Sequence, residues 1–310
     1  MKYTKDRKNN TPLRAGSRWS VLLRAASRGF AVSVFFLLSA SGIAAQNDPA
    51  SLERSLAGGD TEAKRSALFQ LRNLQTAEAS RAAVPALADK DESVRATAAG
   101  SVVFLPKNEA AQVLLPLLAD RSEMVRREAA CALGETGDAA AATALIQLLQ
   151  KDKIIEVKGA AAVALGKLGD AAAVEALVRV LKTGPDDDNE FLRRAAARSI
   201  GQIAQFIQTG RIDNLTPLNF LPDKYKQFGK PKYDDLAAQF PVFKPAVAAL
   251  IETLQSSKEA GDVRREAAYA LGACRDRSAL AALQTASGSS DPYLAEASKE
   301  ALAKLAISSK

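Results

Sequence analysis

A ten-residue segment that recurs along the chain constrains the fold more than any other feature of the sequence. The segment 125–134 reads VRREAACALG. Similar segments begin at six other positions: Val157, Leu192 and Val263, and more weakly Ala63, Val94 and Leu294. The seven starting positions lie 31, 31, 32, 35, 71 and 31 residues apart, so one interval holds about forty additional residues. Self-similarity at this period is typical of proteins built from stacked small units.

Each unit is predicted to contain two helices from the spacing of its apolar residues. Val125, Ala129 and Leu133 lie on one stripe of a helix with 3.6 residues per turn. The leucines within 145–149 form the stripe of a second helix. Two short helices with one apolar stripe each cannot bury these stripes alone, so neighbouring pairs must stack into a continuous core.

The sequence also predicts the junction between the two helices. Gly137 suits the end of the first helix and Asp138 the N-cap of the second, and Gly169 and Asp170 repeat the pattern. The alanines of 160–162 suit close helix packing because they are small and favour helix. The predicted fold is all-α, an α-solenoid of about seven helix pairs with one irregular insertion.

The repeated segment resembles the HEAT-repeat family, in particular short bacterial repeats related to phycobilin lyase repeats, with the core V-R-x-x-A-A-x-A-L-G. The resemblance implies that the helices beginning at Val125, Val157, Leu192 and Val263 line a concave side. Pro85 and Pro116, nine residues before a repeat valine, look like the kinking prolines of the outer helices in that family.

Residues 1–45 have the three parts of a secretory signal peptide. A basic stretch precedes an apolar run that starts near Gly29, and small residues lead to a polar start. We expect cleavage after Ala45, a solenoid over 46–310, and a periplasmic or secreted protein without membrane insertion after cleavage. The alternative is an uncleaved membrane anchor, because the apolar run is at the lower limit for a spanning helix.

The formal net charge of +7 comes from this leader. The leader holds eight basic residues and one acidic residue, which leaves 34 of each sign in the rest of the chain. Because the remainder has no net positive charge, it lacks the electrostatic attraction on which nucleic-acid binding depends. We therefore expect no nucleic-acid partner.

The composition excludes most catalytic chemistry. The chain has no histidine, and its two cysteines, Cys131 and Cys274, lie in separate units and are too few for a zinc cluster. The acidic run 186–190 lacks the glycine and the glutamate of an EF-hand loop, and we interpret it as a capped turn. We expect no cofactor, no metal and no enzymatic activity, although paired carboxylates depend on spatial contacts that a sequence does not show.

Acidic and basic residues also recur in the repeat, such as Asp120 with Arg126 and Asp152 with Lys158. We interpret them as contacts between adjacent units, in line with the resemblance, and not as a catalytic array.

Candidate binding residues are those that point away from the apolar stripe of the first helix. Arginine and tyrosine often anchor protein interfaces. They occur at these positions as Arg127, Arg194, Arg198, Arg265 and Tyr269. The alternative is an ordinary solvated helix face.

The insertion at about 207–243 is rich in aromatic residues interleaved with lysines. Tyr225, Phe228 and Tyr233 are further candidates for partner contact. Alternatively, these rings fasten the insertion onto neighbouring helices. We expect deletion of 207–243 to leave the helical fold largely intact.

The sequence therefore predicts an exported scaffold that binds an unidentified partner protein through its concave face, the insertion or both. A lyase or lyase-accessory role is the alternative that the phycobilin lyase resemblance suggests. A membrane-tethered scaffold is a third possibility if the leader is retained.

Overall fold

A computed structural model of the chain describes residues 49–212 and 230–307. The leader with its predicted cleavage site, and the candidates Tyr225 and Phe228, lie outside these residues. The described residues form helices and connecting turns without a β-strand. None of the helices within these ranges is both long and apolar enough to cross a membrane.

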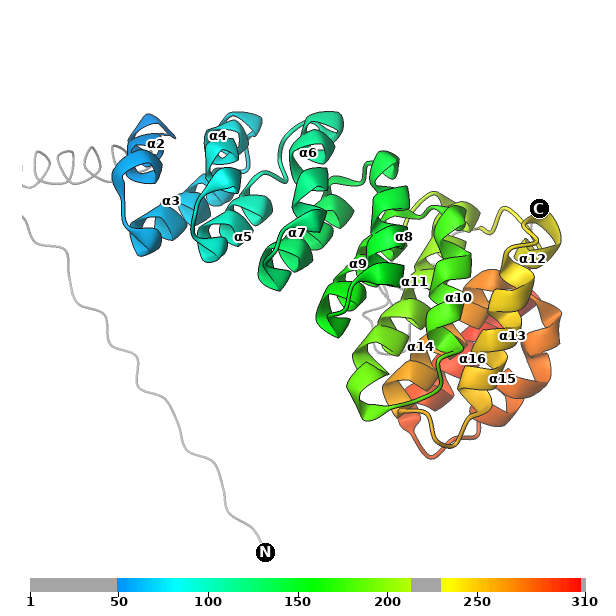
Figure 1. The fold of residues 1–310 in the computed structure, drawn as a ribbon. Coiled ribbons are helices and arrows are strands. Elements are labelled where there is room, and N and C mark those ends of the chain that lie inside the picture. The colour runs from blue at the N-terminus through cyan, green and yellow to red at the C-terminus, as the bar shows by residue number, and fades with distance from the viewer. Residues whose placement is uncertain (1–48, 213–229, 308–310) are drawn as a thin grey trace, which may run out of the picture. The chain divides into compact units, whose positions relative to one another are not determined.

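Two layers of helices alternate along the chain (Figure 1). We call the helices that carry the repeated segment the motif layer: α3 (Thr61–Leu74), α5 (Glu92–Ser101), α7 (Glu123–Thr136), α9 (Ile155–Leu168), α11 (Glu190–Thr209), α14 (Gly261–Cys274) and α16 (Pro292–Ala306). The opposite layer contains α2 (Pro49–Gly58), α4 (Ala77–Ala83), α6 (Lys107–Leu114), α8 (Ala142–Lys151), α10 (Val174–Leu181), α13 (Phe243–Gln255) and α15 (Leu280–Ala286). The prediction of an all-α solenoid of helix pairs is confirmed.

The motif helices start two residues before the repeat valine or leucine, earlier than the sequence predicted. In α5, the Asp91 carboxylate accepts hydrogen bonds from the backbone N–H groups of Ser93 and Val94, at 2.8 and 3.4 Å. The first turn is thus stabilised by its cap. The apolar stripe begins at Val94, which is fully buried.

The predicted junctions are confirmed. Gly137 and Gly169 end α7 and α9 with φ of 66° and 71°, a left-handed conformation that favours glycine. Asp138 and Asp170 then accept backbone hydrogen bonds at 3.0 and 2.9 Å and cap the short 3₁₀ turns that lead into α8 and α10.

The two prolines also act as expected. α4 changes at Pro85 into the 3₁₀ segment η1 (Val84–Ala88), and α6 changes at Pro116 into η2 (Leu115–Ala119). Proline cannot donate the backbone hydrogen bond that would continue the α-helix.

Neighbouring motif helices approach closely at the glycine that ends the repeated segment. A Cβ atom placed on Gly134 would lie 2.7 Å from the Cα of Ala164 in the next motif helix. On Gly272 it would lie 2.8 Å from the Cα of Ala301. These distances are shorter than van der Waals contact, so the layer spacing requires glycine here.

The insertion leaves and re-enters the solenoid at a fixed point. The Gln208 side chain accepts a hydrogen bond from the backbone N–H of Tyr233 at 2.8 Å and donates one to the Tyr233 carbonyl at 3.1 Å. Leu236 and Phe243, further along, are fully buried in the core. The expectation that 207–243 can be deleted with the helical fold intact is therefore wrong for the two ends of this range. They include core residues and the two hydrogen bonds between Gln208 and Tyr233, which we call the clamp.

We predict that Gly134→Ala lowers the melting temperature. Overpacking of this kind costs about 1–3 kcal/mol. The higher helix propensity of alanine offsets at most about 1 kcal/mol of that cost. Gly58→Ala is the matched control, because a Cβ on Gly58 meets no atom within 4 Å. A thermal melt in which both variants are equally stable would contradict the close approach of α7 and α9.

Candidate functional site

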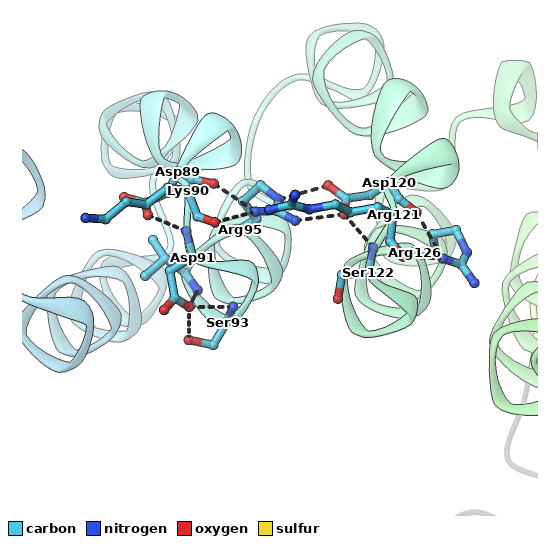
Figure 2. Close-up of polar contacts among 10 residues, drawn as sticks. Asp89, Lys90, Asp91, Ser93, Arg95, Asp120, Arg121, Ser122 and Arg126 are labelled. Carbon is cyan, nitrogen blue, oxygen red and sulfur yellow. Dashed lines mark hydrogen bonds and ion pairs between the residues drawn. The ribbon is translucent and has the colours of Figure 1, made fainter.

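The repeated charged residues form a ladder of ion pairs, one in each of several units, shown in part in Figure 2. Arg95 donates from Nε and Nη2 to the two carboxylate oxygens of Asp120, both at 2.8 Å. Its Nη1 donates to the carbonyl oxygens of Asp89 and Lys90, at 2.9 and 3.2 Å. One guanidinium therefore joins the end of the preceding unit, at Asp89 and Lys90, to the end of the second helix of its own unit, at Asp120.

Arg126 repeats this arrangement one unit later. It donates to the Asp152 carboxylate at 2.6 and 3.1 Å and to the Asp120 carbonyl at 2.9 Å. Each aspartate carboxylate therefore pairs with the arginine at the start of its own unit, Asp120 with Arg95 and Asp152 with Arg126, and not with Arg126 and Lys158 as the sequence predicted. The predicted contact of Arg126 with Asp120 between adjacent units is present through the Asp120 carbonyl.

The ladder continues across the insertion. Arg193 in α11 forms a bidentate ion pair with Glu259, which lies after α13, and the two side chains are 3% and 2% exposed. Arg193 Nη1 also donates to the Leu181 carbonyl. Residues 66 positions apart in the sequence thus occupy the places that Arg95 and Asp120 occupy in a unit without an insertion.

Ladder carboxylates are held in the charged form. The hydrogen bond from Arg95 lowers the pKa of Asp120 below its usual value. The hydrogen bond from Lys64 likewise lowers the pKa of Asp89. Burial opposes the shift at Asp152, but hydrogen bonds from Arg126 and the backbone leave its pKa lowered. Lowered pKa values keep these carboxylates charged, which maintains the ion pairs of the ladder.

Because folding lowers the pKa values of these aspartates, the stability of the protein depends on pH. Below about pH 5 the unfolded chain binds more protons than the folded chain, so stability decreases as the pH falls through the aspartate pKa values. Asp120→Asn removes one such carboxylate. We expect a loss of about 2 kcal/mol at pH 7, typical of a charged hydrogen-bonded contact, and a flatter acid dependence of the melting temperature.

The control is Glu175→Gln in α10, which removes an exposed pair with Arg179 four residues away. Such pairs contribute about 0.3–0.5 kcal/mol. An Asp120→Asn protein as stable as this control at pH 7 would contradict the structural role of the ladder.

A different cluster lies on the outward surface of α11, α14 and α16. Four of the predicted residues come together there: Arg194 and Arg198 from α11, and Arg265 and Tyr269 from α14. We call this surface the arginine face. Arg127 lies apart on α7, where its guanidinium is 3.5 Å from its neighbour Glu128.

Two guanidiniums of the arginine face are fixed by carboxylates and aromatic rings. Arg194 donates to the Asp262 carboxylate at 3.0 Å and lies 5.6 Å from the centre of the Phe191 ring. Arg265 also pairs with Asp262, and it lies 5.5 Å from the centre of the Tyr293 ring. At these distances a guanidinium is attracted electrostatically to the face of an aromatic ring.

Phe191 and Tyr293 were not predicted, although they are 49% and 53% exposed. Both lie immediately before the first residue of a repeated segment, where other units have polar residues such as Ser93 and Glu156, or Met124. A comparison of that position between units would have identified them.

Arg198 differs from the other two arginines. Its Nε lies 3.5 Å from the Glu266 carboxylate, and its side chain is 45% exposed. No hydrogen bond to another described residue accompanies this contact. Burial raises the pKa of Glu266, even though Arg198, Arg194 and Arg265 favour its charged form.

Tyr269 is 8% exposed and so does not project freely, in contrast to the sequence prediction. Its ring packs on Gly201, where an added Cβ would lie 2.7 Å from the ring. Its hydroxyl donates to the Gln205 side chain at 2.5 Å, and the Lys304 ammonium lies 4.9 Å from the ring centre. Tyr269 is therefore a packed, mostly buried member of the arginine face.

A small pocket opens between α14 and α16. Its walls include the rings of Tyr269 and Tyr293, the carboxylate side chain of Glu266, and Ala297. It holds about 80 Å³ of space accessible to water. Pockets for small-molecule ligands are typically about 300–1,000 Å³, so this pocket suits a single side chain.

Tyr233 lies away from the arginine face, at the base of the insertion. Its ring is 5.6 Å from that of Phe240 in an edge-on contact, and both rings pack on the core. For Tyr233 the structure supports the alternative in which the aromatic rings fasten the insertion onto neighbouring helices. Among the residues that the structure describes, no three acidic or cysteine side chains lie close enough to hold a metal ion.

The sequence matches two families of known proteins. The family described as HEAT repeats matches residues 49–130 and 111–201. The family described as PBS lyase HEAT-like repeat matches residues 263–289, which include most of α14 and all of α15. No curated protein matches the sequence.

Several solved structures are similar in fold. An engineered protein is 21% identical, with 82% of this chain and 67% of that chain covered and a TM-score of 0.50. The complex of CpcE and CpcF of phycocyanin lyase from Nostoc sp. PCC7120 is 22% identical, with 83% and 87% covered and a TM-score of 0.46. A designed armadillo repeat protein in complex with the peptide (KR)4 is 18% identical, with 82% and 98% covered and a TM-score of 0.43. At these identities the likeness concerns the fold alone.

Proposed function

Because the chain belongs to the HEAT-repeat family, we propose that it is a non-catalytic scaffold that binds a partner protein on the arginine face. The proposal includes the exported location for which the leader is suited, in the periplasm or outside the cell. It also takes the motif layer as the concave side, in line with the family resemblance.

The observation that carries the proposal is the state of the arginine face before any partner is bound. Arg194 and Arg265 are held by carboxylates and stacked on exposed rings. Ordering a long side chain on binding costs about 0.5–1.5 kcal/mol, so residues ordered in advance favour association. Aromatic residues and arginine are also enriched at protein interfaces.

The same face offers little to an enzyme mechanism. Most carboxylates around it are paired with guanidiniums or a lysine, and the pocket beside it is too small for a typical substrate. Surface complementarity is the mechanism that these features support.

The alternative function is that of a lyase or lyase-accessory protein. It is favoured by the match of residues 263–289 to the PBS lyase HEAT-like repeat. The absorbance spectrum of the purified protein separates the two: a bound tetrapyrrole would favour the alternative.

We predict that a photo-cross-linking amino acid at position 198 captures a discrete partner in intact cells. The matched control is position 179, because Arg179 is also exposed but lies on α10 in the opposite layer. Adducts are expected at position 198 and not at position 179. Equal labelling of both positions, or none at 198, would contradict a binding surface on the arginine face.

Export of the protein and cleavage of its leader can be tested in the same cells. We predict that the mature protein is found in the exported fraction and that its N-terminal residue is Gln46. A protein that retains residues 1–45 and sediments with membranes would instead support the tethered scaffold.

A further inference from the structure

We propose that both end faces of the described solenoid, one on α3 and one on α16, are closed to a second copy of this chain, so that the scaffold works as a single stack. Each unit of a solenoid contacts only its neighbours, so a second copy with matching residues would continue the stack at either end. This inference goes beyond the proposed function, because it concerns the two end faces and not the arginine face.

The position five residues after the start of the repeated segment distinguishes α16 from the other motif helices. In the six motif helices that another unit follows, the residue here is apolar and fully buried: Leu68, Ala99, Ala130, Ala162, Ala197 and Ala268. In α16, which no described unit follows, the residue is Lys299, and 56% of its side chain is exposed. The following unit covers this position elsewhere, whereas α16 presents an ammonium group there.

Lys299 belongs to an ion pair that a stacked copy would cover. Its Nζ lies 2.6 Å from the Glu296 carboxylate. Taking such a pair out of water carries a desolvation penalty that can exceed the attraction between the charges. Ala303 adds a steric obstacle, because it stands where α14 has Gly272, and a Cβ on Gly272 would lie 2.8 Å from the Cα of Ala301.

The end face on α3 differs from the interior at the position that receives the preceding unit. This residue is seven positions after the start of the repeated segment, as is Ala164, which lies against Gly134. In the six later motif helices it is small and at most 2% exposed: Ser101, Ala132, Ala164, Ser199, Ala270 and Ala301. In α3 it is Gln70, whose amide donates a hydrogen bond to the Ser66 hydroxyl at 3.3 Å. Under a second copy this larger side chain would lose its hydrogen bonds with water.

The two end faces therefore carry long polar side chains at positions where stacked units meet through small or apolar residues. An end face that accepted another copy would retain those residues, because they permit the close approach of neighbouring motif helices. The departures occur at both ends of the described stack and at complementary positions, Lys299 on one face and Gln70 on the other.

The test restores interior residues at each end and measures association by analytical ultracentrifugation. The α16 variant carries Lys299→Ala and Ala303→Gly, and the α3 variant carries Gln70→Ala. Each variant alone is expected to remain monomeric, because an opened end then meets a closed one. An equimolar mixture should form a species of about twice the monomer mass, since one contact joins the two opened ends.

A chain with all three substitutions should form larger assemblies, because a head-to-tail contact that does not close continues with every added copy. Their mean mass should increase over about a hundredfold range of protein concentration, as mass action requires. The matched control carries Lys244→Ala and Gln147→Ala, which remove the same side chains from exposed positions of α13 and α8 in the opposite layer. This control should remain monomeric.

Circular dichroism melts establish that the variants are folded. If glycine at position 303 unfolds α16, Lys299→Ala alone replaces the α16 variant, because alanine favours helix. A mixture of folded variants that stays monomeric would overturn the inference, as would a mean mass of the unmodified protein that rises steadily with concentration. Neither result bears on cross-linking at position 198, so failure of the inference and failure of the proposed function are distinguishable.

Discussion

The close approach of neighbouring motif helices is the constraint on which the rest of this structure depends. It is possible because the repeated segment ends in glycine and contains alanines, so that Gly134 packs directly against Ala164. In units stacked in this way, an arginine such as Arg95 reaches the carboxylate of Asp120 in its own unit while it also binds carbonyl groups at the end of the preceding unit. Packing therefore determines the electrostatic ladder.

The ladder explains how the solenoid accommodates a long insertion. Arg193 and Glu259 are separated by 66 positions in the sequence, but they form the same kind of contact as Arg95 and Asp120. A buried pair of this type destabilises the protein strongly if one partner is lost, so it selects the arrangement in which α11 and α14 are neighbours. The clamp between Gln208 and Tyr233 fixes the point at which the inserted chain returns. The insertion thus extends the solenoid without changing its register.

The candidate site consists mainly of side chains that the regular packing of the motif helices leaves exposed. Residues of α11 lie beside residues about one helical turn earlier in the repeat of α14, which brings Arg194 next to Asp262 and Arg198 next to Glu266. The sequence identified the arginines of this surface, because the period of the repeat shows which residues point outward. It misjudged Tyr269, whose exposure depends on the absence of a side chain at Gly201 in the adjacent unit. It also missed Phe191 and Tyr293, since their significance comes from the guanidiniums stacked on them.

By itself, the sequence determined the helix pairs, their number, the glycine and aspartate junctions and the proline breaks. These features follow from the period of apolar residues and from local backbone preferences, which a short segment contains in full. The tertiary structure alone decided which aspartate pairs with which arginine, that Glu259 replaces an aspartate across the insertion, and which carboxylates the arginines of the arginine face contact. Those outcomes depend on the distance and rotation between units, and contacts between residues of different units set both.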